Sequence, residues 1–196
     1  MKRALLLSVK PRFVAKILNG EKTIEVRKSN PKCYLPIEVY IYCTKDKDKL
    51  FYRNTVKEYA IANSNWKLIN FVKVYNVADY PTRNLNGKVV AKFTLKEIRL
   101  AKYQEQVDGK SKLANKLTCL TDEELDKYLN KKNGYGWVID DLVIFDKPKE
   151  LSEFKANKKY WCDKCPYQYG ICLPKCEELK PLTKAPKSYQ FIESEK

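Results

Sequence analysis

The sequence contains no histidine among its 196 residues. This absence excludes Ser-His-Asp and Cys-His catalytic groups, and it removes imidazole as a general base or metal ligand. Long apolar runs are also missing. The run Ala4–Leu7 is far shorter than the roughly 20 apolar residues that a membrane-spanning helix needs. We therefore expect a cytoplasmic protein, in which cysteine clusters are better explained by metal than by disulfides.

Glycine is scarce, at 6 residues, whereas tyrosine is abundant, at 14. Lysine and arginine number 39 against 24 acidic residues, which gives a net charge of +15. A surplus of this size attracts polyanions, and tyrosine rings can stack on bases. Nucleic acid is therefore the expected partner, and the alternative is a merely solvated, lysine-rich surface.

Hydrophobic patterning predicts several strands and two short helices. One helix begins at Pro11, and the other begins at Thr121, where Thr121 and Glu124 form a capping box. Strands are predicted at 4–9, 22–28, 37–43, 88–95, 137–145 and 188–192. Pro148 is expected to end the strand 137–145. Residues 45–86 are expected to be an insertion with irregular structure. This pattern predicts one α+β domain over 1–196, built around a curved sheet or small barrel.

The segment after the first helix carries several charged residues in a short stretch. In the strand 22–28, period-two alternation places Thr23, Glu25 and Arg27 on one face. Together with Lys10 and Lys22, these side chains could hold one ligand, because lysine and arginine bind phosphate and glutamate accepts from a base amino group. The alternative is a solvent-facing strand on which Glu25 and Arg27 simply pair with each other.

Four cysteines near the C-terminus have the spacing of a metal site, Cys162-x2-Cys165-x6-Cys172-x3-Cys176. Four thiolates can close a tetrahedral shell around Zn²⁺, and a closed shell is typical of a structural site. An iron–sulfur cluster is the other metal hypothesis, and four ordinary thiols or two disulfides are the alternatives without metal. The predicted metal-binding element covers about 159–178, and the metal would cross-link the loop between the last two strands.

The sequence resembles the ASCH domain family of PUA-like proteins, in particular longer, often phage-encoded members with a C-terminal cysteine cluster. The likeness rests on the stretches 5–11, 17–27, 39–44, 86–93, 134–142 and 180–189, of which Gly20-x-Lys22-x-x-Glu25-x-Arg27 is the most specific. It implies a small β-barrel with short flanking helices and a basic cleft that binds RNA or a modified nucleotide. The residues it implies for that cleft are Ser8, Lys10, Lys22, Thr23, Glu25, Arg27, Lys28, Tyr42 and Trp137.

Some proteins that this chain resembles are hydrolases of an acylated nucleoside or of RNA. The resemblance places Lys22 at their working lysine, but Glu25 stands where they have a threonine nucleophile. Longer members often have histidine where this chain has Val138. Lys22 and Glu25 are therefore the catalytic candidates, and Trp137 is expected either to stack on a base or to pack in the core.

Three functions follow from these patterns. The first is a nucleic-acid-binding module, and the second is a hydrolase acting on an acylated nucleoside or on RNA. The third is a factor that engages a protein partner, for example a phage protein that contacts a host protein, through the aromatic-rich insertion 45–86.

Overall fold

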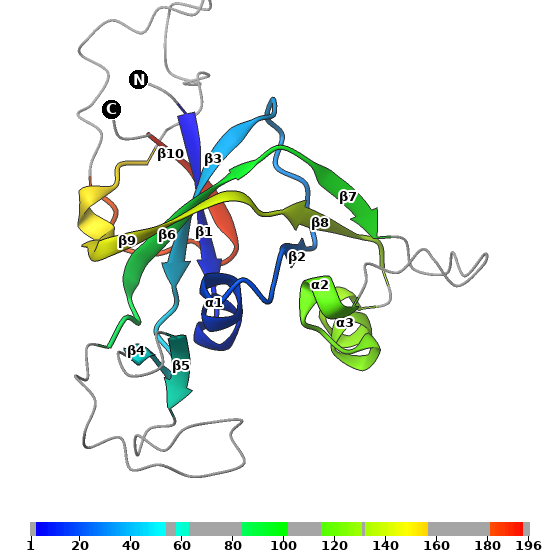
Figure 1. The fold of residues 1–196 in the computed structure, drawn as a ribbon. Coiled ribbons are helices and arrows are strands. Elements are labelled where there is room, and N and C mark those ends of the chain that lie inside the picture. Colours follow the sequence, from blue (N-terminus) through cyan, green and yellow to red (C-terminus); the bar gives the residue numbers. More distant parts are fainter. Residues whose placement is uncertain are drawn as a thin grey trace, which may run out of the picture.

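The computed structural model describes residues 3–53, 58–62, 84–101, 115–130, 132–156 and 181–193. Within these ranges the chain is an α+β protein in which strands predominate and the helices are short (Figure 1). The strands are β1 (Arg3–Val9), β2 (Ile24–Arg27), β3 (Ile37–Cys43), β4 (Lys49–Arg53), β5 (Glu58–Ala62), β6 (Lys88–Leu95), β7 (Ile98–Ala101), β8 (Gly134–Val138), β9 (Asp140–Glu150) and β10 (Tyr189–Glu193). The helices are α1 (Pro11–Leu18), α2 (Asn115–Thr118), α3 (Asp122–Leu129) and the 3₁₀ turn η2 (Leu151–Glu153).

The larger sheet has five strands in the order β10-β1-β3-β6-β9. The inner strand β1 pairs parallel with the central strand β3 and antiparallel with the edge strand β10. Leu5, Leu7 and Val9 belong to one apolar cluster, and Ala4 and Leu6 belong to another. Both faces of β1 are therefore covered, which explains why its sequence is an unbroken apolar run.

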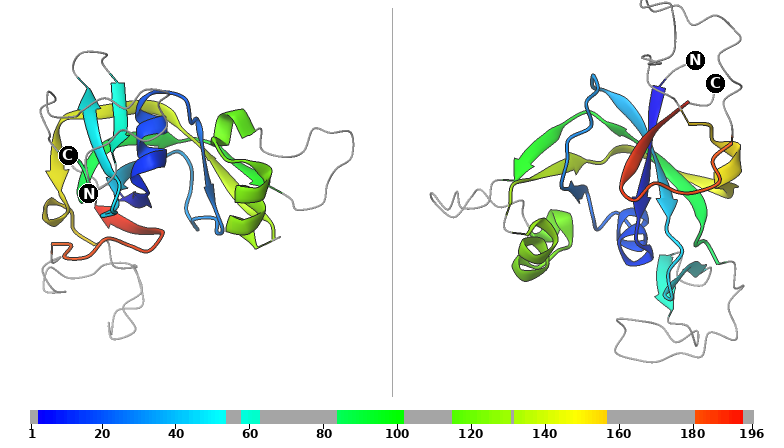
Figure 2. Two further views of the ribbon diagram at one scale, coloured as in Figure 1. Left: turned by 90° about the horizontal axis from the view of Figure 1, so that it is seen from below. Right: turned by 180° about the vertical axis from the view of Figure 1, so that it is seen from behind.

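The smaller sheet, in the order β2-β8-β7, is joined to the larger one by two continuous chain segments. β6 leads through two residues into β7, and β8 leads through Ile139 into β9. These two antiparallel segments pass from one sheet to the other, so the surface they form bends between the sheets (Figures 1 and 2). The curved sheet is thus as predicted.

A closed barrel is not formed by the strands that the structure describes. Their pairing leaves β9 and β10 at the edges of the larger sheet and β2 and β7 at the edges of the smaller one. The four-residue strand β2 pairs only with β8. Within the described residues, the predicted small β-barrel is therefore corrected to two joined open sheets.

The described part of the insertion is more regular than expected. Residues 49–53 and 58–62 form the antiparallel pair β4–β5. Asn19, the C-cap of α1, fixes this pair because its side chain accepts from the backbone N–H of Tyr59 and donates to the Tyr59 carbonyl, each at 2.8 Å. The strand pair β4–β5 is therefore attached to the end of α1 by two hydrogen bonds between Asn19 and Tyr59.

The other predicted elements are present with two differences: the single strand predicted at 137–145 is the end of β8 and the start of β9, and Pro148 lies inside a strand. The capping box of α3 is present: the Thr121 hydroxyl accepts from the Glu124 N–H, and the Glu124 carboxylate accepts from the Thr121 N–H, both at 3.1 Å. Pro148 does not break its strand, because β9 is an edge strand whose outer side needs no backbone donor. No helix in the described ranges is long and apolar enough to cross a membrane.

Candidate nucleic-acid interface

Strand β2 separates apolar from charged side chains. Ile24 and Val26 are buried in a cluster with Leu125 and Leu129 of α3, so helix α3 covers one face of the strand. Period two then directs Glu25 and Arg27 to the opposite face, as the alternation predicted. Figure 1 shows α2 and α3 beside β2, at the side of the molecule away from β10.

Glu25 lies between two buried cations. One of its carboxylate oxygens is 2.8 Å from an Arg27 nitrogen, and the other is 3.3 Å from the Lys22 ammonium. The side chains of all three residues are less than 10% exposed. The pairing of Glu25 with Arg27 is therefore present, but on a buried face and not on a solvent-facing strand. Two positive groups against one negative group leave the cluster with a charge of +1.

Both cations also donate to backbone carbonyls. The Lys22 ammonium donates to the Thr118 carbonyl at 2.5 Å, which ties the cluster to α2. Arg27 donates to the Ser8 carbonyl at 2.7 Å. Because Arg27 belongs to β2 and Ser8 to β1, this side chain links the two sheets at the edge where no backbone ladder joins them. The Arg27 guanidinium group thus bridges the boundary between β1 and β2, which we call the seam.

Ser8, on the β1 side of the seam, forms two hydrogen bonds with the segment that leads into β10. Its N–H donates to the Ser188 carbonyl at 2.9 Å, and its hydroxyl donates to the Pro186 carbonyl at 2.7 Å. The Ser188 hydroxyl in turn lies 3.5 Å from Arg27. The segment that leads into β10 is therefore held against the charged cluster. Sequence reasoning missed Ser188, which lies far from β2 along the chain.

Two buried donors at this seam have no acceptor among the residues that the structure describes. They are the Nε of Arg27 and the indole N–H of Trp137. Trp137 is the cross-strand partner of Glu25, so its side chain lies on the same face as the charged cluster. Unpaired buried donors cost free energy, and a ligand with acceptor atoms would recover it.

The Trp137 ring itself packs in the core. It is fully buried, and its centroid lies 5.1 Å from that of Tyr189. Of the two alternatives for Trp137, base stacking or core packing, its burial favours core packing.

Burial lowers the pKa of Lys22 from its ordinary value, and the negative charge of Glu25 acts in the opposite direction. Desolvation penalises the charged ammonium, whereas the neighbouring carboxylate favours it. A buried lysine with a lowered pKa is the group from which a proton is most easily removed in this cluster.

Tyr128 of α3 is a residue of this face that the sequence analysis did not identify. Burial raises the pKa of its hydroxyl, and the charge of Arg27 opposes that shift. The side chain is still 37% exposed, and the Lys28 ammonium lies 5.2 Å from its ring centroid. Tyr128 follows Leu125 by three positions and precedes Leu129, so its place at the edge of the buried face of α3 could have been found from helical spacing.

The other predicted residues are spread more widely. Lys10 is exposed at the N-cap of α1, and Lys28 is exposed just after β2. Thr23 is half-buried and contributes backbone hydrogen bonds to Leu117 and Ile139. Tyr42 belongs to the apolar cluster on the other face of the larger sheet from Trp137, so it does not share a ligand site with the charged cluster.

The four cysteines of the predicted metal element lie outside the described residues: Cys162, Cys165, Cys172 and Cys176. The ends of their segment are nevertheless placed. Lys155 and Pro181 form an antiparallel bridge, and the Leu182 N–H donates to the Phe154 carbonyl at 2.8 Å. The described residues on either side of the cysteine segment are therefore paired with each other. Elsewhere in the described ranges, no three metal-ligating side chains come together.

Comparison with family profiles and with curated proteins finds no match. Three similar solved structures are those of an ASCH protein from Zymomonas mobilis and of two single-residue variants of it. They cover 76% of this chain and 73–76% of their own, at 14–15% identity and a TM-score of 0.47. A TM-score below 0.5 at this identity carries no argument about family or activity, so the ASCH resemblance stays a prediction from the sequence.

Proposed function

We propose that this protein binds nucleic acid, most simply RNA or a modified nucleotide, at the seam between β1 and β2. The observation that carries the proposal is the buried cluster of Lys22, Glu25 and Arg27. It has one positive charge in excess, and the Nε of Arg27 has no acceptor among the described residues. Such a cluster favours an anionic, acceptor-rich ligand, and phosphates and base carbonyls are both of this kind.

The rim of the seam supports the same class of ligand. Tyr128 offers a partly exposed ring beside Arg27, and stacking of a base on an aromatic ring is worth about 1–3 kcal/mol. Lys28 lies close to that ring and can meet a phosphate. The net charge of +15 hastens the encounter with any polyanion.

Fluorescence anisotropy with short single- and double-stranded RNA and DNA, across a salt series, tests the proposal. We expect Tyr128→Ala to weaken binding roughly 5- to 150-fold, the range that the loss of one stacked base gives. Tyr34→Ala is the matched control, because Tyr34 is 97% exposed in a loop before β3. Lys28→Ala should lower the salt slope by about 1. Equal effects of Tyr128→Ala and Tyr34→Ala would refute the seam as the binding site.

A hydrolase is the second candidate, because burial lowers the pKa of Lys22 beside the carboxylate of Glu25. A lysine that loses its proton more readily can act as a general base towards an acylated nucleoside or an RNA hydroxyl. Incubation with N4-acetylcytidine and with labelled RNA, followed by product analysis, tests this. Turnover that is lost in Lys22→Arg would support it, and the absence of product with folded protein would remove it.

We also propose that the C-terminal cysteines bind one structural Zn²⁺. The support is their spacing together with the paired stem at Lys155 and Pro181, which brings the two ends of their segment side by side. A metal that closes a loop stabilises the protein by limiting the freedom of the unfolded chain. The four thiolates would leave no position for water, so the metal would serve the fold and not the chemistry.

A further inference from the structure

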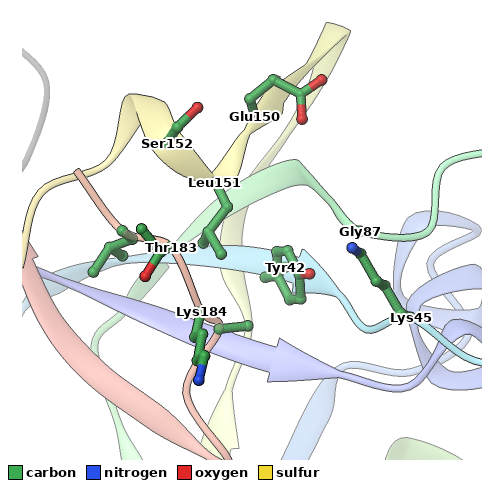
Figure 3. Close-up of a pocket in the computed structure, with 10 residues that line it drawn as sticks. Tyr42, Lys45, Gly87, Glu150, Leu151, Ser152, Thr183 and Lys184 are labelled. Carbon is green, nitrogen blue, oxygen red and sulfur yellow. The ribbon is translucent and has the colours of Figure 1, made fainter.

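A cavity lies on the opposite face of the larger sheet from Trp137. Its volume is about 580 Å³, which is within the range of small-molecule sites. The residues that line it come from four separate parts of the chain: Tyr42, Lys45, Gly87, Glu150, Leu151, Ser152, Leu182, Thr183, Lys184 and Ala185. Figure 3 shows Tyr42 between Lys45 and Lys184, with Leu151 beside it.

Tyr42 is the most deeply placed polar residue of this cavity. Its side chain belongs to the apolar cluster of the sheet and is only 5% exposed. Burial raises the pKa of its hydroxyl, and the nearby charge of Glu150 acts in the same direction. The hydroxyl therefore stays protonated at neutral pH and can donate a hydrogen bond.

Lys45 lies on a loop whose position is fixed. The Asn86 side chain accepts from the Leu50 N–H at 2.9 Å and donates to the Asp48 carbonyl at 2.7 Å. Next to it, Gly87 has a φ of +80° and donates to the Cys43 carbonyl at 2.8 Å. A Cβ at Gly87 would lie 3.2 Å from the Lys45 side chain, so the lysine stem rests where only glycine leaves room.

Lys184 lies on a segment that is equally well held. Leu182 and Ala185 pack against the apolar cluster of Tyr42, and the Pro186 carbonyl accepts from the Ser8 hydroxyl at 2.7 Å. In the described part of the chain, neither Lys45 nor Lys184 forms a salt bridge. Glu150, the acidic residue at the rim, is already paired with Lys88. Two lysines without a salt bridge to any described residue, and one buried tyrosine, thus line one cavity.

We propose that this cavity, the Tyr42 pocket, is a second binding site, which takes the phosphate group of a nucleotide between Lys45 and Lys184. Leu151, Leu182 and Ala185 give the pocket an apolar wall for the base or sugar. The phosphate can come from a free nucleotide or from a nucleic-acid strand. The proposal does not depend on the seam, because the pocket lies on the other face of the sheet.

Isothermal titration calorimetry with AMP, GMP, CMP, UMP and inorganic phosphate, and with a 12-nucleotide RNA, tests the Tyr42 pocket. The test variant is Lys45→Ala/Lys184→Ala. The charge-matched control is Lys32→Ala/Lys147→Ala, which removes two exposed lysines that do not line the pocket. We expect the test variant to weaken nucleotide binding at least 10-fold and the control to leave it within 2-fold. Tyr42→Phe, which keeps the ring in the apolar cluster, should weaken binding by a smaller factor.

The variants also separate this proposal from that of the seam. Tyr128→Ala should leave nucleotide binding at the Tyr42 pocket unchanged even if RNA binding at the seam is lost. Free nucleotides that bind would identify the ligand as a small molecule, whereas RNA alone that responds to the test variant would identify the phosphate of a strand. Equal losses in the test and control variants, or no binding of any probe to the wild-type protein, would overturn the proposal.

Discussion

The buried carboxylate of Glu25 gives the most direct test of the structure. Glu25→Gln keeps the size of the side chain but removes the negative charge between Lys22 and Arg27, which lie 3.3 and 2.8 Å from its oxygens. Both cations would remain buried without a counter-charge. Breaking a buried ion pair in this way costs about 3–5 kcal/mol, a large part of the roughly 5–15 kcal/mol that holds a domain folded.

Urea denaturation at pH 7 measures this cost. With a denaturant slope of roughly 2 kcal/mol per molar urea, the midpoint should fall by about 1.5–2.5 M. The matched control is Glu97→Gln, because Glu97 pairs with Arg99 on the surface, where both side chains are about half exposed. Its midpoint should stay that of the wild-type protein, since exposed ion pairs contribute little.

A double variant shows whether the loss comes from charge or from shape. Lys22→Met removes one of the two stranded cations, so Glu25→Gln/Lys22→Met should be more stable than Glu25→Gln alone. The reasoning fails if Glu25→Gln costs less than about 1 kcal/mol, or if the double variant is no more stable than the single one.

Three further predictions concern pH, packing and metal. Burial lowers the pKa of Lys22 from 10.5, so this lysine binds its proton more weakly in the folded protein than in the unfolded chain. The contribution of Lys22 to the free energy of unfolding therefore increases as the pH rises towards 10.5. The free energy of unfolding of wild type relative to Lys22→Met should therefore increase between pH 7 and 10 in urea titrations, and a constant difference would contradict the shift. Gly134→Ala would place a Cβ 2.6 Å from the buried Leu129 side chain, so it should lower the stability by about 1–3 kcal/mol, and an unchanged thermal midpoint would contradict that contact. Elemental analysis should find one zinc per chain, and a thiol-specific mercurial should release it. The zinc should be lost in Cys162→Ser/Cys165→Ser and retained in the control Cys119→Ser. Wild-type protein without metal would refute the site.

Patterns among residues that are close together in the sequence determine several helices and strands of this protein. The apolar run of β1, the alternation of β2 and the capping box of α3 are set by residues close together in the chain, so their strands and helix were predictable. Glu25 and Arg27 were placed on one face for the same reason. Pro148 misled the prediction because a proline is excluded only from strands with a partner on both sides, and the edge position of β9 is a property of the sheet.

Only the tertiary structure decided what surrounds those residues. The period of β2 does not tell whether its charged face meets solvent or core. That face is buried because Arg27 reaches across to the carbonyl of Ser8 and α2 offers the carbonyl of Thr118 to Lys22. In the same way, the chain brings Tyr42, Lys45 and Lys184 to one cavity from positions up to 142 residues apart, which is 184 − 42. The sequence alone determines which side chains share one face of a strand or helix, whereas the pairing of distant segments determines which faces pack against each other.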